Sequence, residues 1–202
     1  MSRVSDTFDE TASALKRGLP AVFPTETVYG LGVAVAFAQS PEVLYQLKRR
    51  EKRKPISWLV SSCEDLPRYG TCVPEFASVL ARTFWPGPLT LIVKASEEVP
   101  LSFRSDAGTI GLRMPNNDCA LSLIRAVGCS IATTSANISG LAAARAFREL
   151  DDELACQVAA VLSDDDDAGK SGIASTVIDC TADHPRIVRE GAITIADIQA
   201  LS

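Results

Sequence analysis

The chain has 202 residues, of which 47% are hydrophobic and 22% charged, so it carries enough apolar material for one large hydrophobic core. This composition excludes an intrinsically disordered chain and a collagen-like fibre. Twenty-five acidic residues against 20 basic ones give a net charge of -5, which argues against capture of nucleic acid by overall charge but leaves room for a local basic patch. A single histidine, His184, excludes every mechanism that needs two.

Cysteine usage and the N-terminal sequence bear on the cellular compartment. The six cysteines include no CxxC pair, so we expect reduced, mostly buried thiols rather than a disulfide framework or a zinc site. The polar N-terminal sequence is typical of neither a signal nor a transit peptide, and no apolar run approaches the ~20 residues of a membrane-spanning helix. We therefore predict a cytoplasmic protein with one domain over residues 1–202.

Helical and extended patterns alternate along the chain. Apolar residues at helical spacing, from Phe8 through Ala12 to Leu15, predict an opening helix that ends near Gly18. Ser40-Pro41-Glu42 predicts the start of the next helix, with Ser40 as the N-cap residue, Pro41 at the first helical position and Glu42 in the first turn. Further helices are expected from 74, at 118–127 and at 194–201, and strands at 21–23, 28–36, 56–60, 89–93, 109–113, 130–133, 158–162, 176–178 and 187–188. This interleaving predicts a layered α/β domain.

The densest charge lies at 48–54, Lys48-Arg49-Arg50-Glu51-Lys52-Arg53-Lys54, which holds six of the 20 cations. One interpretation is a solvated helix C-terminus, where cations complement the helix dipole. The other is a site for a polyanion, either a nucleotide triphosphate or an RNA backbone. The residues alone leave both interpretations open.

Polar side chains gather after two of the predicted strands. Residues 24–32, PTETVYGLG, place two threonines, a glutamate and a tyrosine at a strand end, where open α/β sheets tend to bind ligands. Residues 133–140, TTSANISG, offer small hydroxyls and an amide that can bind phosphate or hydrogen-bond a base. A polar turn or a helix N-cap without any ligand uses the same residue types.

Gly169-Lys170-Ser171 looks like the end of a phosphate-binding P-loop. That motif requires a glycine five positions before Gly169, where this chain has Asp164. Because the four carboxylates of 164–167 would repel phosphates, we interpret the segment as a solvated acidic loop. Arg113 and Arg189 each end a short predicted strand, where a guanidinium can form a surface ion pair or bind a carboxylate or phosphate.

Seven segments, taken in order, resemble the YrdC family of threonylcarbamoyl-AMP synthases. They are PTETVYGLG (24–32), KRREKRK (48–54), WPGPLT (85–90), TIGLRMP (109–115), TTSANISG (133–140), STVID (175–179) and REG (189–191). Each segment alone is weakly specific, but their order and separations argue against chance similarity. The resemblance runs from about residue 16 to 195, nearly the whole chain.

The resemblance implies a fold and a reaction. Members of the family are α/β proteins with a twisted mixed β-sheet, flanking helices and a concave, locally basic ligand face. They are nucleotidyltransferases that condense L-threonine, bicarbonate and ATP, expected with Mg²⁺, into threonylcarbamoyl-AMP and pyrophosphate. Other proteins then transfer the threonylcarbamoyl group to N6 of adenosine 37 in tRNA. The chain resembles the short, single-domain form of the family.

The family's motif positions imply site residues in this chain. Thr27, Arg113, Thr133 and Ser175 would bind L-threonine, with Arg113 pairing with its carboxylate. Lys48 and Arg50 would also have a catalytic role, because they would neutralise the triphosphate. The implied ATP-binding residues are Lys48, Arg50, Lys54, Thr109, Ser135, Asn137 and Arg189.

Two alternatives stand beside the synthase hypothesis. An RNA-binding or ribosome-assembly factor of the same fold would use the basic run to contact tRNA or double-stranded RNA, without adenylate synthesis. A paralogous branch would keep the anion site but lack the threonine pocket. Binding of both L-threonine and ATP is expected of the synthase alone.

Overall fold

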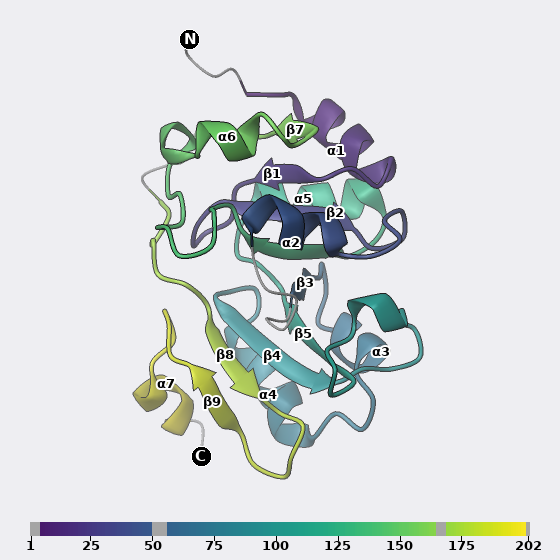
Figure 1. The fold of residues 1–202 in the computed structure, drawn as a ribbon. Coiled ribbons are helices and arrows are strands. Elements are labelled where there is room, and N and C mark those ends of the chain that lie inside the picture. Colours follow the sequence, from purple (N-terminus) through teal and green to yellow (C-terminus); the bar gives the residue numbers. More distant parts are fainter. Residues whose placement is uncertain (1–4, 50–55, 165–168, 201–202) are drawn as a thin grey trace.

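The computed structural model describes residues 5–49, 56–164 and 169–200 (Figure 1). The strands are β1 (Ala21–Phe23), β2 (Gly30–Ala34), β3 (Ser57–Leu59), β4 (Leu89–Lys94), β5 (Thr109–Arg113), β6 (Ile131–Ser135), β7 (Ala160–Val161), β8 (Thr176–Asp179) and β9 (Arg186–Arg189). The helices are α1 (Phe8–Lys16), α2 (Glu42–Lys48), α3 (Asp65–Tyr69), α4 (Glu75–Phe84), α5 (Asp118–Val127), α6 (Asp152–Ala155) and α7 (Ile195–Gln199), with short 3₁₀ turns η1 (Leu101–Phe103) and η2 (Phe147–Glu149).

The strands form one mixed sheet in the order β7-β1-β2-β6-β3-β5-β4-β8-β9. β1 with β7, β3 with β5 and β4 with β8 are parallel pairs, and the other neighbours are antiparallel. Figure 1 shows how far the sheet twists between β1 and β2 and the C-terminal strands β8 and β9. The predicted α/β fold with a twisted mixed sheet and flanking helices is therefore confirmed.

Local sequence signals set the limits of α1 and α5. Thr7 begins α1 with a capping box: its Oγ1 accepts from the Glu10 N–H, while the Glu10 carboxylate accepts from the Thr7 N–H. Asn117 begins α5, because its Oδ1 accepts from the Ala120 N–H at 2.8 Å. Gly128, with a φ of +82°, ends α5 in the left-handed conformation.

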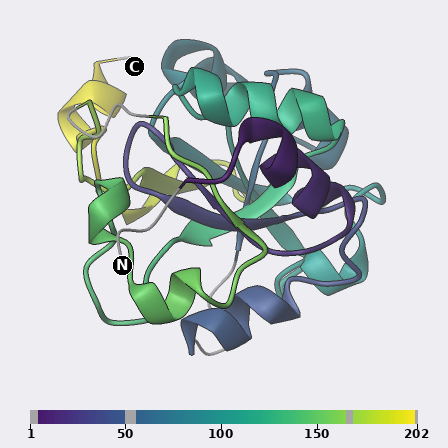
Figure 2. The same cartoon turned by 90° about the horizontal axis from the view of Figure 1, so that it is seen from above.

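A hydrophobic cluster joins α1 and α5 to one face of the sheet. Leu15 of α1 and Leu123 of α5 pack there with Ala21 and Phe23 of β1. Val22, between those two β1 residues, belongs to a second cluster, because successive strand side chains point to opposite faces. Figure 2 shows α1 and α5 on one side of β1 and β2, and α2 on the other.

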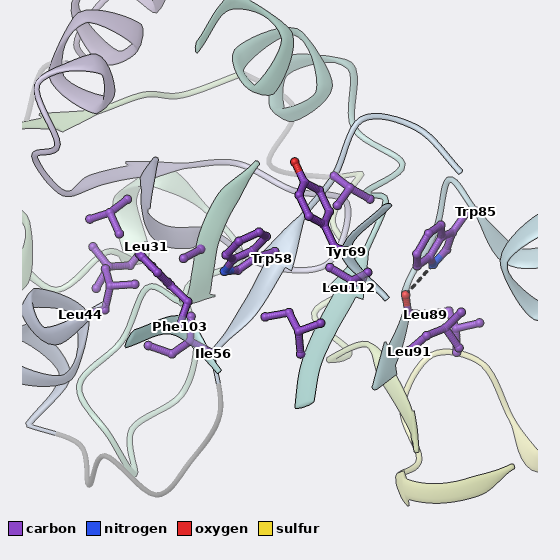
Figure 3. Packing of buried hydrophobic residues seen from close by; sticks show 14 of the residues in the cluster. Leu31, Leu44, Ile56, Trp58, Tyr69, Trp85, Leu89, Leu91, Phe103 and Leu112 are labelled. Atoms are coloured by element: carbon purple, nitrogen blue, oxygen red, sulfur yellow. Dashed lines mark hydrogen bonds between the residues drawn. The ribbon is translucent and has the colours of Figure 1, made fainter. Parts of the chain in front are cut away.

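The second and larger cluster contains the aromatic core (Figure 3). Trp58 is 1% exposed, and its ring meets those of Tyr69 and Phe103 edge to face, with centroids 5.1 and 5.7 Å away. Trp85 donates from Nε1 to the carbonyl oxygen of Leu89 at 2.8 Å. This bond fixes the turn between α4 and β4, which the WPGP sequence predicts.

The predicted strands and the longer helices are confirmed to within a few residues. The short helices α3 and α6 are absent from the sequence prediction, because four or five residues present too little of the helical period. Ser40 is not the N-cap residue of α2; Pro41 occupies that position, although Ser40 Oγ accepts from the Glu42 N–H. Within the described ranges, no helix has the length and apolar character to cross a bilayer.

All six cysteines are free thiols, as expected, but the expectation that most are buried is wrong. Cys180 is buried, while Cys72 and Cys156 are exposed and the other three are partly exposed. Burial raises the pKa of the Cys180 thiol to about 12, so this group stays protonated at neutral pH. Cys180 directly follows β8 and packs in the larger hydrophobic cluster, whereas Cys72 and Cys156 belong to neither cluster.

Leu112 tests the packing of the larger cluster. Its side chain is fully buried, so Leu112→Ala is expected to lower the free energy of unfolding by about 3 kcal/mol, through lost burial and a residual cavity. Urea denaturation measures this change. Leu101→Ala is the matched control, because Leu101 is 81% exposed and its loss should change stability by less than about 0.5 kcal/mol. Equal effects of the two substitutions would contradict the placement of Leu112.

Candidate functional site

The two-residue period of the central strands separates the core from a polar cavity. On β3, Trp58 enters the larger hydrophobic cluster, whereas Ser57 and Leu59 line the cavity. On β5, Leu112 enters the cluster and Arg113 lines the cavity. The same alternation on β4 and β5 places residues 90, 92, 109 and 111 on the cavity side. One face of these strands therefore carries the core and the other carries the site.

The cavity has a volume of about 470 Å³, which suits a small organic ligand. Its wall includes the guanidinium groups of Arg113 and Arg189, and among the lining residues there is no carboxylate, histidine or cysteine. The described side chains therefore favour an anionic ligand with many hydrogen-bonding groups. The hydroxyl-bearing lining residues are Thr25, Thr27, Tyr29, Ser57, Thr90, Thr109, Thr133, Thr134, Ser135 and Ser175.

The PTET segment forms one wall through a turn built by its own side chains. Thr25 Oγ1 donates to the Val28 carbonyl at 2.6 Å and lies 2.9 Å from Thr27 Oγ1. Thr25 Oγ1 also accepts from the N–H groups of Thr27 and Val28, each at 3.3 Å. The adjoining Tyr29 N–H donates to the Ala144 carbonyl at 2.8 Å. These bonds hold Thr27, which is 1% exposed, in a fixed position at the cavity.

Arg113 presents part of its guanidinium to the cavity. Its Nε donates to the Gly87 carbonyl at 3.3 Å, and its Nη2 donates to Thr27 Oγ1 at 3.1 Å. The same Nη2 lies 2.7 Å from Oε1 of Glu26. Nη1 has no hydrogen bond to any residue that the structure describes. Both of its N–H bonds are therefore available to an anion such as a carboxylate.

Arg189 lies at the rim and joins the last three strands of the sheet. Its Nη2 and Nε donate to the Ser175 carbonyl at 2.8 and 3.1 Å, and Nη2 also donates to Ser175 Oγ at 3.1 Å. Ser175 Oγ in turn lies 2.9 Å from Thr90 Oγ1, and both of these side chains are buried. The guanidinium thus fixes a row of hydroxyls along the cavity wall.

Lys48 holds the turn that follows β6. Its ammonium group donates to the carbonyl oxygens of Ser135 and Asn137 at 2.5 and 2.7 Å and to Asn137 Oδ1 at 2.9 Å. Ser135 Oγ donates to the same Oδ1 at 2.6 Å. Lys48 is only 3% exposed, so its charge acts on this turn rather than on open solvent. The structure therefore joins the start of the basic run to the TTSANISG segment.

The predicted site residues fall into three groups. All four residues predicted to bind L-threonine line the cavity, and so do Thr109, Ser135 and Arg189 of the predicted ATP set. Lys48 and Asn137 meet each other beside Ser135 but are not lining residues. Arg50 and Lys54 lie outside the described residues.

A buried ion pair anchors the chain on the other side of the PTET segment. Lys170 Nζ lies 2.7 Å from Asp164 Oδ1, and the two side chains are 2% and 10% exposed. Asn117 Nδ2 donates to Asp164 Oδ2 at 2.9 Å, and Lys170 Nζ lies 5.0 Å from the centroid of the Tyr29 ring. For Asp164, the interpretation as part of a solvated loop is wrong, whereas 165–167 lie outside the described residues.

The residues after Lys170 fasten this anchor to the site. The Ser171 N–H donates to the Glu26 carbonyl at 3.0 Å, and the Gly172 N–H donates to the Thr27 carbonyl at 2.9 Å. Gly172, which lines the cavity, has a φ of +69°, a conformation that favours glycine. The segment that looks like a P-loop thus positions the PTET segment through backbone bonds.

The chemistry available in the cavity is hydrogen bonding and charge compensation. Burial raises the pKa of the nearby Cys119 thiol to about 11, and the Asp164 carboxylate adds to the rise, so this thiol is not an activated nucleophile. Among the described residues, no group of three His, Cys, Asp or Glu side chains could hold a metal ion. The site therefore suits a reaction driven by positioning and by neutralisation of anions.

Three contributors to the site are absent from the set predicted from sequence. Thr90 lies in the WPGPLT segment, and its hydroxyl at the start of a strand is a feature of the sequence that could have indicated a site residue. Glu26 lies between two threonines of PTET, but only the tertiary structure pairs it with Arg113. Lys170 follows an acidic run, and for that reason the sequence predicts no phosphate site in its segment. Its ion pair with Asp164 depends on burial, which the sequence does not reveal.

Comparisons with known proteins agree with this geometry. Residues 13–191 match the family described as Sua5/YciO/YrdC, telomere recombination. The chain is 34% identical over 190 residues to a threonylcarbamoyl-AMP synthase of Pyrococcus abyssi (strain GE5 / Orsay), and 35% identical over 196 residues to one of Bacillus subtilis (strain 168). These matches cover 93% and 95% of this chain and 55% of each relative. The chain thus spans about half the length of these curated relatives.

A solved structure shares the fold. The crystal structure of P. abyssi Sua5 complexed with L-threonine is 32% identical to this chain and superposes with a TM-score of 0.86. The superposition covers 96% of this chain and 56% of that one.

Loss of the Lys170 charge tests the buried anchor. Lys170→Met removes the ammonium group that lies 2.7 Å from the buried Asp164 carboxylate, so we expect a loss of about 3 kcal/mol of unfolding free energy in urea denaturation. Lys94→Met is the control, because Lys94 is exposed at the end of β4. The double variant Lys170→Met/Asp164→Asn should recover part of the loss, since it removes both charges of the buried pair. A single variant as stable as Lys94→Met would refute the anchor.

Proposed function

Because the chain belongs to the Sua5/YciO/YrdC family, we propose that it makes threonylcarbamoyl-AMP and pyrophosphate from L-threonine, bicarbonate and ATP. The observation that carries the proposal is the Nη1 group of Arg113, available within a cavity lined by hydroxyls. The 32% identical P. abyssi protein, solved with L-threonine, supports this choice of amino acid. No specific feature of the described residues favours the RNA-binding alternative.

L-threonine would bind at the end of the cavity formed by Arg113 and the PTET segment. Arg113 Nη1 would pair with the carboxylate of L-threonine. The hydroxyls of Thr27, Thr133 and Ser175 would form hydrogen bonds with the other polar groups of this ligand, as donors or acceptors. Thr90, which holds the Ser175 hydroxyl, is an additional positioning residue. The small volume and buried hydroxyls favour a short polar side chain.

ATP would bind toward the rim and the basic run. Thr109, Ser135 and Arg189 would contact the nucleotide, and Arg50 and Lys54 would neutralise the triphosphate. Lys48 supports this site by holding the turn of Ser135 and Asn137, and its direct contact with phosphate stays a prediction.

Magnesium is expected as part of the ATP substrate. The lining residues offer hydroxyls and guanidinium groups but no carboxylate, a set that does not suit Mg²⁺ by itself. The ion would therefore enter with the phosphates of ATP, and the described residues give it no cage of their own.

The proposed reaction needs two anions brought together in a defined geometry. The threonine amine captures carbon dioxide derived from bicarbonate, which forms a carbamate and releases a proton. A carbamate oxygen then attacks the α-phosphorus of ATP, and pyrophosphate leaves with the electrons of the broken P–O bond. Two unit charges 4 Å apart repel by about 4 kcal/mol at an effective dielectric of ~20, so cations at both ends lower the barrier.

The chemistry of the proposed product, threonylcarbamoyl-AMP, indicates which partner proteins the chain would need. A threonylcarbamoyl adenylate is a mixed anhydride that readily gives up its acyl group, so a second protein would transfer this group to adenosine 37 of tRNA. The shared name of the curated relatives supports the adenylate as the product. Contact of this chain with tRNA through residues 48–54 is a further expectation from their charge.

A pyrophosphate-release assay tests the proposal. Purified chain with ATP, Mg²⁺, bicarbonate and L-threonine should release pyrophosphate, and threonylcarbamoyl-AMP should appear by mass spectrometry. Omission of L-threonine or bicarbonate should reduce the rate to background, because the nucleophile is a carbamate made from both. Pyrophosphate release that is independent of L-threonine would refute the proposed function.

Arg113 provides the second test. Arg113→Ala should weaken L-threonine binding by about 100-fold, as expected for loss of a charged partner, while ATP affinity changes less than about threefold. Isothermal titration calorimetry measures both. Arg186→Ala is the control, because the Arg186 side chain is 76% exposed and does not line the cavity. Arg113→Lys keeps a positive charge beside Glu26 but loses the planar guanidinium. It should therefore also weaken L-threonine binding more than ATP binding. Equal losses for both ligands would show that Arg113 does not define the amino-acid end.

A further inference from the structure

Glu26 places a carboxylate directly behind the proposed ligand-binding arginine. Its side chain is 16% exposed, both carboxylate oxygens are buried, and Oε1 lies 2.7 Å from Arg113 Nη2. Glu26 is not a lining residue of the cavity, whereas its neighbours Thr25 and Thr27 are. The carboxylate therefore faces away from a bound substrate and toward the arginine.

The contact is a poor source of stability. Neither oxygen of Glu26 makes a hydrogen bond of good geometry with the described part of the chain. A buried ion pair offsets the cost of removing two charges from water only when additional hydrogen bonds satisfy both partners. A gain in stability therefore does not explain the Glu26 carboxylate at this position. The effect of this carboxylate on Arg113 explains it better.

Glu26 completes a set of contacts that fixes the guanidinium plane. Gly87 accepts from Nε, Thr27 accepts from Nη2, and Glu26 lies against Nη2. These contacts occupy one edge of the planar group and leave Nη1 for the cavity. Without the Glu26 carboxylate, Nη2 loses its charged partner and is free to turn toward any anion in the cavity, including a phosphate.

The backbone of Glu26 is itself held in place. Its carbonyl oxygen accepts from the Ser171 N–H at 3.0 Å, and the Thr27 carbonyl accepts from the Gly172 N–H at 2.9 Å. The carboxylate is thus attached to a segment fixed by the buried Lys170 anchor. The pairing with Arg113 is a constrained contact rather than a chance meeting of two flexible side chains.

We propose that Glu26 is a positioning residue, which holds Arg113 with Nη1 toward the cavity and so reserves this end of the site for the carboxylate of an amino acid. The inference rests on the proposed function. Because Glu26 already balances part of the guanidinium charge, the site prefers a singly charged carboxylate to a triphosphate.

Calorimetry of the full chain tests this role. Glu26→Gln keeps the shape of the side chain but removes its charge, so L-threonine binding should weaken by about tenfold, as is typical when an outer partner of a ligand-binding group is lost. ATP affinity and the thermal midpoint should stay close to those of the wild type. Glu75→Gln is the matched control, because Glu75 forms an exposed pair of the same 2.7 Å length with Arg82.

Introducing Glu26→Gln into the Arg113→Lys variant distinguishes a positioning role of Glu26 from a general effect on stability. In Arg113→Lys, the planar group that Glu26 aligns is absent, so adding Glu26→Gln should weaken L-threonine binding by less than about twofold. A merely structural role would give the same loss in both backgrounds and would lower the thermal midpoint. If Glu26→Gln does not fold, Glu26→Asp, which keeps the charge but shortens the side chain, carries the same prediction of weakened L-threonine binding.

The outcomes distinguish the two proposals. Unchanged or tighter L-threonine binding by Glu26→Gln, with normal binding by the wild type, would overturn the role of Glu26 alone. Tighter binding would show that Glu26 competes with the substrate carboxylate for Arg113. Absence of L-threonine binding by the wild type would overturn the proposed function and this inference with it.

Discussion

The alternation of side chains along the central strands is the constraint on which the rest of the structure depends. Trp58 and Leu112 must leave water, so their neighbours Ser57 and Arg113 necessarily face the opposite side of the same strands. A shift of one residue would place the guanidinium in the hydrophobic cluster and turn the indole toward the polar cavity. Core packing therefore fixes the register of β3 and β5, and that register in turn positions the polar wall of the cavity.

Three cations of this acidic chain are enclosed by the fold. Lys48, Arg113 and Lys170 are each less than 9% exposed, and each has defined oxygen acceptors in the fold. Removing a charge from water costs several kcal/mol, and these fixed partners offset part of that cost. The same partners keep the cations from reorienting, which is the condition for stabilising a developing charge without reorganisation.

Segments far apart in sequence meet at the PTET turn. Glu26 and Thr27 receive backbone bonds from 171–172, Tyr29 donates to Ala144, and the side chain of Thr27 accepts from Arg113. A change in any of these segments would therefore reach the end of the cavity that Arg113 and the PTET segment form. The buried Lys170–Asp164 pair supports the PTET turn through the backbone bonds of residues 171–172 and through the contact of Lys170 with the Tyr29 ring.

The sequence predicts the α/β class, the strands and the longer helices, because strand and helix patterning are local properties, and its resemblance to a family implies the four residues expected to bind L-threonine. It did not determine the sheet order, the ion pair of Glu26 with Arg113, or the burial of Lys170. Residues 26 and 113 are joined only because the Arg113 end of β5 and the turn after β1 lie at one edge of the cavity. Tertiary structure alone decides such contacts, since burial and long-range pairing depend on how the whole sheet is assembled and not on the neighbours in the chain.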